Sequence, residues 1–80
     1  MPALKSFDRI TVETGKCGGK PCIRGMRITV RRVLELLASY SDRAALIADY
    51  PFLEPEDLNQ ALRYAAVAVD DESLSIDRVA

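Results

Sequence analysis

Apolar residues recur in the middle of the chain at the spacing of one helix face, and this pattern predicts a mainly α-helical domain. The first such stretch covers roughly 30–38, where the apolar positions follow i, i+3, i+4 and i+7. These positions are Val30, Val33, Leu34 and Leu37. Thr29 precedes them and belongs to a residue type favoured at the N-cap, so we expect a first helix to begin there.

Two further helices follow in the same pattern. Ser41 is the expected N-cap of a second helix over roughly 42–49, which Pro51 ends because a residue before proline avoids the helical region. Pro55 suits the first position of a third helix, where its missing N–H costs nothing. The inward face of this third helix is predicted to contain Leu58, Ala61, Leu62, Ala65 and Val69.

The N-terminal part of the chain has the alternation of a short β-hairpin. Residues 9–13 predict one strand, and residues 14–21 predict a glycine-containing loop. Residues 22–28 predict an extended return that a turn or bulge interrupts at Gly25. Because an isolated two-stranded hairpin is only marginally stable, we expect its apolar residues to pack in a homodimer. The residues of this predicted interface are Ile10, Val12, Ile23 and Ile28.

The predicted fold class is therefore mainly α, with a short N-terminal β-hairpin followed by a three-helix, homeodomain-like (helix-turn-helix) bundle. Residues 1–69 form this domain in our interpretation, and residues 70–80 form an acidic C-terminal tail. The chain has 80 residues, and a domain of that size buries only about 60% of its unfolded surface, so it gains from a partner. No apolar run has the length of a membrane span and no signal peptide opens the chain, which predicts a cytoplasmic protein without membrane contact.

Charge divides the chain into two halves. Residues 1–32 have eight cations and two acids, a net charge of +6, whereas residues 33–80 have three cations and ten acids, a net charge of −7. Such an asymmetry predicts two different contact surfaces. The alternative is that the two halves fold against each other and partly neutralise.

Most of the residues that catalysis or metal binding would need are missing from the chain. The chain has no His, which removes the commonest general base and the commonest metal ligand. Cys17 and Cys22 offer two thiols where a structural zinc ion needs four ligands. We therefore predict a protein that is not an enzyme, with no metal and no cofactor, in which both cysteines are reduced thiols of a loop.

The basic half of the chain predicts contact with duplex DNA. Clustered guanidinium groups are typical of proteins that bind nucleic acids. Such a cluster lies just before the first helix and in the first turn of that helix. On the third helix three polar side chains are able to contact base edges. The predicted DNA-binding residues are thus Lys20, Arg24, Arg27, Arg31, Arg32, Asn59, Gln60 and Arg63. The alternative is that the arginines pair internally with Glu35, Asp49 or Glu54.

Three segments together resemble a known family. Residues 19–30 have the sequence GKPCIRGMRITV, residues 49–53 have DYPFL, and residues 54–57 have EPED. The chain resembles in these segments the bacterial domain-of-unknown-function family 433, whose pattern is G-K-P-x-I-x-G-T-R-I-x-V, D-Y-P-x-L and T-P-E-D. Met26 and Glu54 depart from it, because each stands where the family usually has Thr.

The resemblance implies a function as well as a fold. It implies a VapB-like antitoxin of a type II toxin-antitoxin pair, which neutralises a PIN-like ribonuclease toxin and binds DNA for autoregulation. The expected toxin-binding residues lie in the tail, where apolar residues would anchor the chain and an arginine would enter the acidic nuclease site: Leu74, Ile76 and Arg78. The alternative is a non-catalytic protein–protein interaction module without DNA binding, which the acidic third helix favours.

Overall fold

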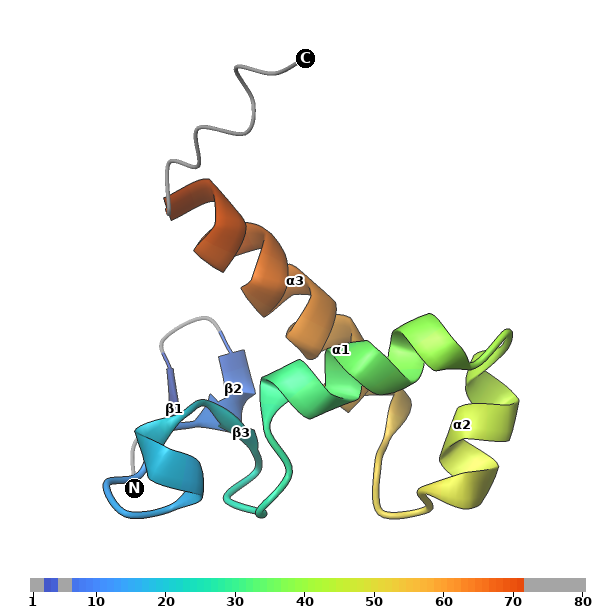
Figure 1. Cartoon of the computed structure of the whole chain (residues 1–80), viewed down its shortest axis with the longest axis horizontal. Coiled ribbons are helices and arrows are strands. Elements are labelled where there is room, and N and C mark those ends of the chain that lie inside the picture. Colours follow the sequence, from blue (N-terminus) through green and yellow to red (C-terminus); the bar gives the residue numbers. More distant parts are fainter. Residues whose placement is uncertain (1–2, 5–6, 72–80) are drawn as a thin grey trace.

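A small antiparallel sheet precedes three helices (Figure 1). The computed structural model describes residues 3–4 and 7–71. The strands are β1 (Ala3–Leu4), β2 (Phe7–Thr11) and β3 (Cys22–Ile23), in the order β1-β2-β3, and the helices are α1 (Val30–Ser39), α2 (Arg43–Asp49) and α3 (Pro55–Asp71). The predicted fold class is confirmed, and β1 is a strand that the sequence pattern did not predict.

The return strand of the hairpin is shorter than predicted. Ile23 pairs with Ile10 in the register of β2 and β3, but the chain then turns sharply instead of continuing extended to residue 28. The amide of Met26 donates to the carbonyl of Ile23 over 2.8 Å, and the amide of Ile23 donates to the carbonyl of Ile28 over 3.0 Å. Arg24 has a φ of 46° and Gly25 a φ of 72° in this turn, a backbone that alternation of side chains does not reveal.

The helices begin and end close to their predicted positions. The side chain of Thr29 accepts a hydrogen bond from the amide of Arg32, as expected of the α1 N-cap. The N-cap of α2 is Asp42 and not Ser41, because the Asp42 carboxylate accepts from the amide of Ala45 over 2.8 Å. The prediction of Ser41 as this cap was wrong by one residue. Asp and Ser have similar cap preferences, so their adjacency in the sequence did not distinguish them.

The core lies where α1, α2 and the start of α3 meet the sheet. Its fully or almost fully buried apolar residues are Ile10, Ile23, Val30, Val33, Leu36, Leu46, Leu53, Leu58 and Ala61. Ile10 and Ile23 are 0% exposed within one chain, and Val12 and Ile28 are half-buried. Ile10 and Ile23 thus pack against the helices of their own chain, which corrects their assignment to a dimer interface, whereas Val12, Ile28 and the dimer itself stay predictions.

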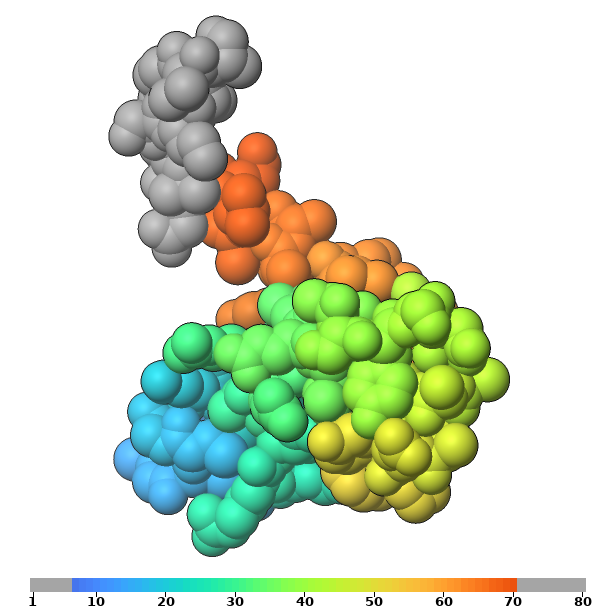
Figure 2. Space-filling view, turned by 45° about the vertical axis from the view of Figure 1, so that its right-hand side comes forward, coloured from blue at the N-terminus to red at the C-terminus, as the bar shows by residue number. Residues whose placement is uncertain are grey.

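The outer half of α3 extends beyond this core. In Figure 1 the helix rises away from α1 and the sheet, and Figure 2 shows its outer turns standing clear of the body. Three apolar side chains of α3 are correspondingly exposed, namely Leu62, Val67 and Val69. The helix continues to Asp71, two residues into the segment predicted as tail, and the predicted toxin-binding residues Leu74, Ile76 and Arg78 lie outside the described residues.

Among the helices of the described residues, none combines the length and the apolar character that crossing a bilayer requires.

Candidate functional site

A buried carboxylate at the start of α3 organises the polar residues of this region. Asp57 is 0% exposed, and its carboxylate accepts hydrogen bonds from Arg24 Nε over 3.1 Å and from Arg24 Nη2 over 3.0 Å. Arg9 Nη1 lies 3.1 Å from the same carboxylate, and the amide of Glu54 donates to it over 2.9 Å. Two guanidinium groups therefore neutralise one buried charge, and the carboxylate also caps the N-terminus of α3.

These contacts decide the ionisation of Asp57. Burial alone would raise the pKa of Asp57, but the hydrogen bonds from Arg24, from the Glu54 amide and from Arg9 outweigh it and lower that pKa. Arg24 is further fixed because its Nη2 donates to the carbonyl of Phe52 over 2.6 Å. Arg24, predicted as a DNA-binding residue, thus has its guanidinium engaged within the molecule.

The side chains of α3 that were predicted to contact bases are also engaged internally. Gln60 is buried, accepts from the amide of Arg9 over 3.0 Å and donates to Asp8 over 2.6 Å. Arg63 pairs with Glu56 over 3.1 Å, and Asn59 accepts from Arg43 Nη1 over 2.7 Å.

Glu56 is a centre of this second set of contacts. Hydrogen bonds from Gln60, Arg63 and Asn59 hold the pKa of Glu56 below its usual range, so its negative charge persists beside Asn59 and Arg63. Gln60 is inaccessible to DNA in this fold, which corrects its prediction as a residue that contacts bases. Asn59 and Arg63 remain at the surface, but they would have to exchange their internal partners for a base.

The other predicted DNA-binding residues remain exposed around the start of α1. Arg31 and Arg32 both pair with Glu35, at 3.3 and 3.2 Å, which is one of the internal pairings considered from the sequence. Lys20 and Arg27 are exposed and form no ion pair within the described part of the chain. Four cations thus remain at one end of α1, although Glu35 partly balances two of them.

The two cysteines are free thiols in the loop before β3 and in β3 itself. Cys22 is 2% exposed and its Sγ lies 3.3 Å from the carbonyl of Lys20. Burial, and next the hydrogen bond shared with Cys17, raise the pKa of Cys22 to about 11. Since a thiolate is the form that binds metals and attacks electrophiles, the raised pKa disfavours both reactions for Cys22 at neutral pH. Within residues 3–4 and 7–71, no three His, Cys, Asp or Glu side chains gather as a metal site would require.

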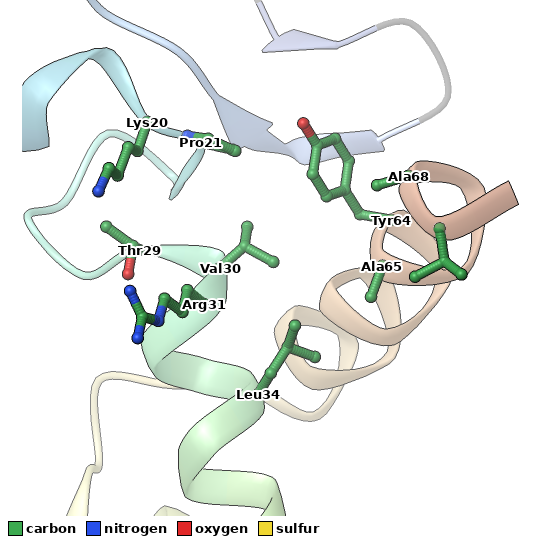
Figure 3. A pocket seen from close by; sticks show the side chains of 10 residues that line it. Lys20, Pro21, Thr29, Val30, Arg31, Leu34, Tyr64, Ala65 and Ala68 are labelled. Carbon is green, nitrogen blue, oxygen red and sulfur yellow. The ribbon is translucent and has the colours of Figure 1, made fainter. Parts of the chain in front are cut away.

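An apolar groove separates the outer half of α3 from the start of α1 (Figure 3). Its volume is about 310 Å³, and the residues that line it are Lys20, Pro21, Thr29, Val30, Arg31, Leu34, Tyr64, Ala65, Ala68 and Val69. Tyr64 is positioned by an edge-to-face contact with Phe7 of β2, at a ring distance of 5.5 Å. Figure 3 shows Lys20 and Arg31 on the side opposite Ala65 and Ala68, with their charged ends directed away from these alanines, so the groove is apolar and the two cations lie at its edge.

The sequence pattern did not identify this groove. Ala65 and Val69 were predicted to face the protein interior, and they do face toward α1, but no element of the described residues fills the space between them and α1. The length of the third helix could have indicated it. The apolar stripe of this helix is longer than the part that two short helices and a small sheet are able to bury. We call this surface, with the residues named above, the α1/α3 groove.

Comparison with known proteins places the described fold in a family context. The family model "Protein of unknown function (DUF433)" matches residues 10–65. The crystal structure of a DUF433 member protein from Anabaena variabilis ATCC 29413 is similar, with 33% sequence identity and a TM-score of 0.69. The match covers 88% of this chain and 65% of that one, so this chain spans less than two thirds of the other protein's length. No curated protein matches the chain.

Proposed function

The chain belongs to the DUF433 family, and from this premise we propose that it is a non-catalytic protein-binding domain that acts as an antitoxin against a PIN-like ribonuclease. The resemblance of its motifs supplies the class of partner. The α1/α3 groove supplies the surface, and it is the observation on which the proposal mainly depends. A groove with an apolar floor and a few charged groups at its edge is typical of surfaces that receive another protein.

The charges of the groove suit this partner. PIN-like nucleases hold their metal ion with a cluster of carboxylates, so their active sites are acidic. Arg31 has a side chain that is 79% exposed, and Lys20 is on the same wall of the groove. A guanidinium group placed among carboxylates replaces the positive charge of the metal ion and forms bidentate hydrogen bonds. Arg31 therefore joins Arg78 as a candidate for that role.

The tail remains part of the proposal. Residues 72–80 follow α3 in the sequence, and Leu74, Ile76 and Arg78 are proposed to contact the same partner. An extended anchor of this kind would add a strand to the partner's sheet. Deleting residues 72–80 is expected to weaken inhibition of the nuclease. Unchanged affinity after the deletion would confine the contact to the groove.

The experiment is a titration of the chain into a purified PIN-like nuclease, with RNA cleavage as the readout. Wild type is expected to inhibit in a fixed molar ratio. Ala68→Glu places a carboxylate in the groove opposite the acidic partner and is expected to weaken inhibition at least tenfold. Ala66→Glu is the matched control, because Ala66 is on the same helix, is exposed and does not line the groove. Equal effects of the two substitutions, or full cleavage with wild type, would contradict the proposal.

DNA binding is a second candidate, and the exposed cations around the start of α1 favour it. Arg27→Ala combined with Arg31→Ala is expected to weaken binding to all duplex sequences and to reduce the salt slope by about one unit per lost phosphate contact. Asn59→Ala with Arg63→Ala is expected to change binding little, because those side chains bond internally. The reverse order of effects would place the DNA contact on α3.

A further inference from the structure

The two cysteines of the chain lie at the ends of one short loop and contact the same residue. Cys17 begins the 3-10 turn η1 (Cys17–Gly19), and Cys22 begins β3. The amide of Lys20 donates to the carbonyl of Cys17 over 3.2 Å, and the Cys22 thiol donates to the carbonyl of Lys20 over 3.3 Å. A further hydrogen bond joins the two thiol groups themselves. The fold therefore holds the two sulfur atoms close together.

Cys17 has a backbone conformation that suits glycine better than cysteine. Its φ is 51°, in the left-handed region where a side chain raises the free energy of the backbone. Residues held in this region concentrate at functional sites. Arg24 also has a positive φ, and its contact with Asp57 accompanies that conformation. Cys17 lies outside the core, and the contact that it makes from this backbone is the one with the Cys22 thiol.

The two thiols differ in their access to solvent. Cys17 is half-buried, so a reagent in solution can reach its sulfur, whereas Cys22 is 2% exposed. Redox-sensing cysteines are accessible to solvent and often lie next to a second cysteine that resolves the first oxidation product. The accessible Cys17 and the buried Cys22 have this arrangement.

The loop between the cysteines has room to adjust. Closing a disulfide brings two sulfur atoms to about 2 Å, which is closer than a hydrogen bond between thiols holds them. Gly18 and Gly19 lie between the cysteines, and a Cβ built on either would meet no atom of the described residues within 4 Å. The short shift that a disulfide requires therefore meets no steric barrier at these glycines.

We propose that Cys17 and Cys22 form a reversible intramolecular disulfide when the protein meets a small-molecule disulfide such as oxidised glutathione. The Cys17 thiolate attacks one sulfur of the reagent, a mixed disulfide forms on Cys17, and one small thiol leaves with the proton that Cys17 lost. The Cys22 sulfur then attacks the Cys17 sulfur, and the second small thiol leaves with the electron pair and the proton of Cys22. The two cysteines are thereby oxidised by two electrons, and the reagent is reduced to two thiols.

The second step proceeds although Cys22 is mostly protonated at neutral pH. The attacking sulfur and its target belong to one loop, so the reaction is intramolecular and its effective concentration is high. A thiolate of high pKa is also a strong nucleophile once it forms. The loop that the bond closes is short, so the bond constrains the unfolded chain little. It therefore suits a switch that opens and closes with redox conditions better than a permanent cross-link.

The disulfide alters one edge of the α1/α3 groove. A bonded sulfur has no hydrogen to donate, so the carbonyl of Lys20 loses its hydrogen bond from Cys22. Lys20 and Pro21 line the groove, and the carbonyl of Pro21 accepts from the amide of Val30 over 2.9 Å. An effect of oxidation on partner binding rests on the proposed function, whereas formation of the disulfide does not.

The test is peptide mapping by mass spectrometry after incubation of the full chain with oxidised glutathione at about pH 8. Free thiols are then blocked with N-ethylmaleimide. Trypsin does not cleave between Lys20 and Pro21, so both cysteines lie on one peptide, residues 17–24. Wild type is expected to yield this peptide two hydrogens lighter, with no blocking group and no glutathione.

Two variants separate the roles of the cysteines. Cys22→Ser keeps a donor for the Lys20 carbonyl but removes the resolving thiol, so glutathione on Cys17 is expected to be at least tenfold more abundant than in wild type. Cys17→Gly suits the left-handed backbone, and it is expected to leave Cys22 free because that side chain is buried.

Four results would overturn the disulfide proposal. These are free cysteines in wild type, glutathione on Cys17 of wild type at the level of Cys22→Ser, a disulfide between two chains, and modification of Cys22 in Cys17→Gly as fast as that of Cys17 in Cys22→Ser. None of these measurements involves the nuclease. Failure of the disulfide is therefore distinguishable from failure of the antitoxin function, which the cleavage titration measures by itself.

Discussion

Asp57 links the start of the chain to α3 through two arginines. Asp57→Ala removes the carboxylate and leaves Arg9 and Arg24 without their shared partner, so we expect the free energy of unfolding to fall by about 3 kcal/mol. Asp57→Asn keeps the shape and the N-cap acceptor and is expected to cost less. Urea denaturation of both variants measures the difference. Equal losses would mean that the charge of Asp57, and not its shape or its cap acceptor, determines its contribution to stability.

The same carboxylate gives stability a pH dependence. The pKa of Asp57 is lower in the folded protein than its ordinary value of 3.8, so its ionised form stabilises the fold above that value. This contribution is expected to disappear as the pH falls below 3.8 and through the folded pKa. Asp57→Asn is expected to flatten this part of the pH profile, measured by urea midpoints between pH 2 and 7. A profile unchanged by the substitution would assign the acid transition to other carboxylates.

Cys22 is expected to be unreactive in the folded state. Its pKa of about 11 keeps it protonated at pH 8, and its side chain is buried. Mass spectrometry after treatment with iodoacetamide should show that Cys22 is modified only when urea is present. Half-buried Cys17 provides the internal comparison, since it is expected to be modified first. Rapid modification of Cys22 without denaturant would mean that β3 opens readily.

At the level of elements, the sequence pattern predicted the helices because their apolar spacing and their prolines act locally. Thr29, Pro51 and Pro55 each determine a helix end through their own backbone or side chain, without help from distant residues. The sequence predicted a turn or bulge at Gly25, but it did not predict the left-handed backbone of Arg24, which accompanies the contact of Arg24 with Asp57, 33 residues away. Local pattern contains no information about such a long-range pair.

The corrected cap of α2 can be checked by substitution. Asp42→Ala removes the acceptor for the Ala45 amide and is expected to lower the free energy of unfolding by about 1 kcal/mol. Ser41→Ala is expected to have little effect, because the Ser41 side chain does not cap the helix. Thermal or urea unfolding of the two variants measures this order. A larger loss for Ser41→Ala would restore the cap to the residue expected from the sequence.

In the whole molecule, some of the charges of the basic and acidic halves pair with each other and others stay exposed. Part of it is neutralised internally, because Arg9 and Arg24 of the basic half pair with Glu54 and Asp57 of the acidic half. The remainder stays on the surface, with Lys20 and Arg31 beside the groove and Asp70 exposed near the far end of α3. The sequence predicted internal neutralisation and exposed contact surfaces as alternatives. Only the folded structure shows which charged residues pair internally and which stay exposed.

The α1/α3 groove could not be predicted from the sequence, because it also depends on how the elements are arranged in space. Periodicity indicates which face of a helix is apolar, but it does not indicate whether another element covers that face. Leu58 and Ala61 are buried in the core, whereas Ala65 and Val69 of the same predicted face line the α1/α3 groove. The candidate site therefore follows from the small size of the body relative to the length of α3, a property of the whole molecule.

The central claim is that the α1/α3 groove is where this protein binds its partner. The most direct measurement is the change of amide chemical shifts in isotope-labelled chain when the unlabelled PIN-like nuclease is added. We predict that the largest changes occur at amides lining the groove, such as those of Val30, Leu34, Ala65 and Ala68, with little change at Arg43 and Asn59. Changes concentrated on α2 and the start of α3, with the groove amides unaffected, would contradict the account.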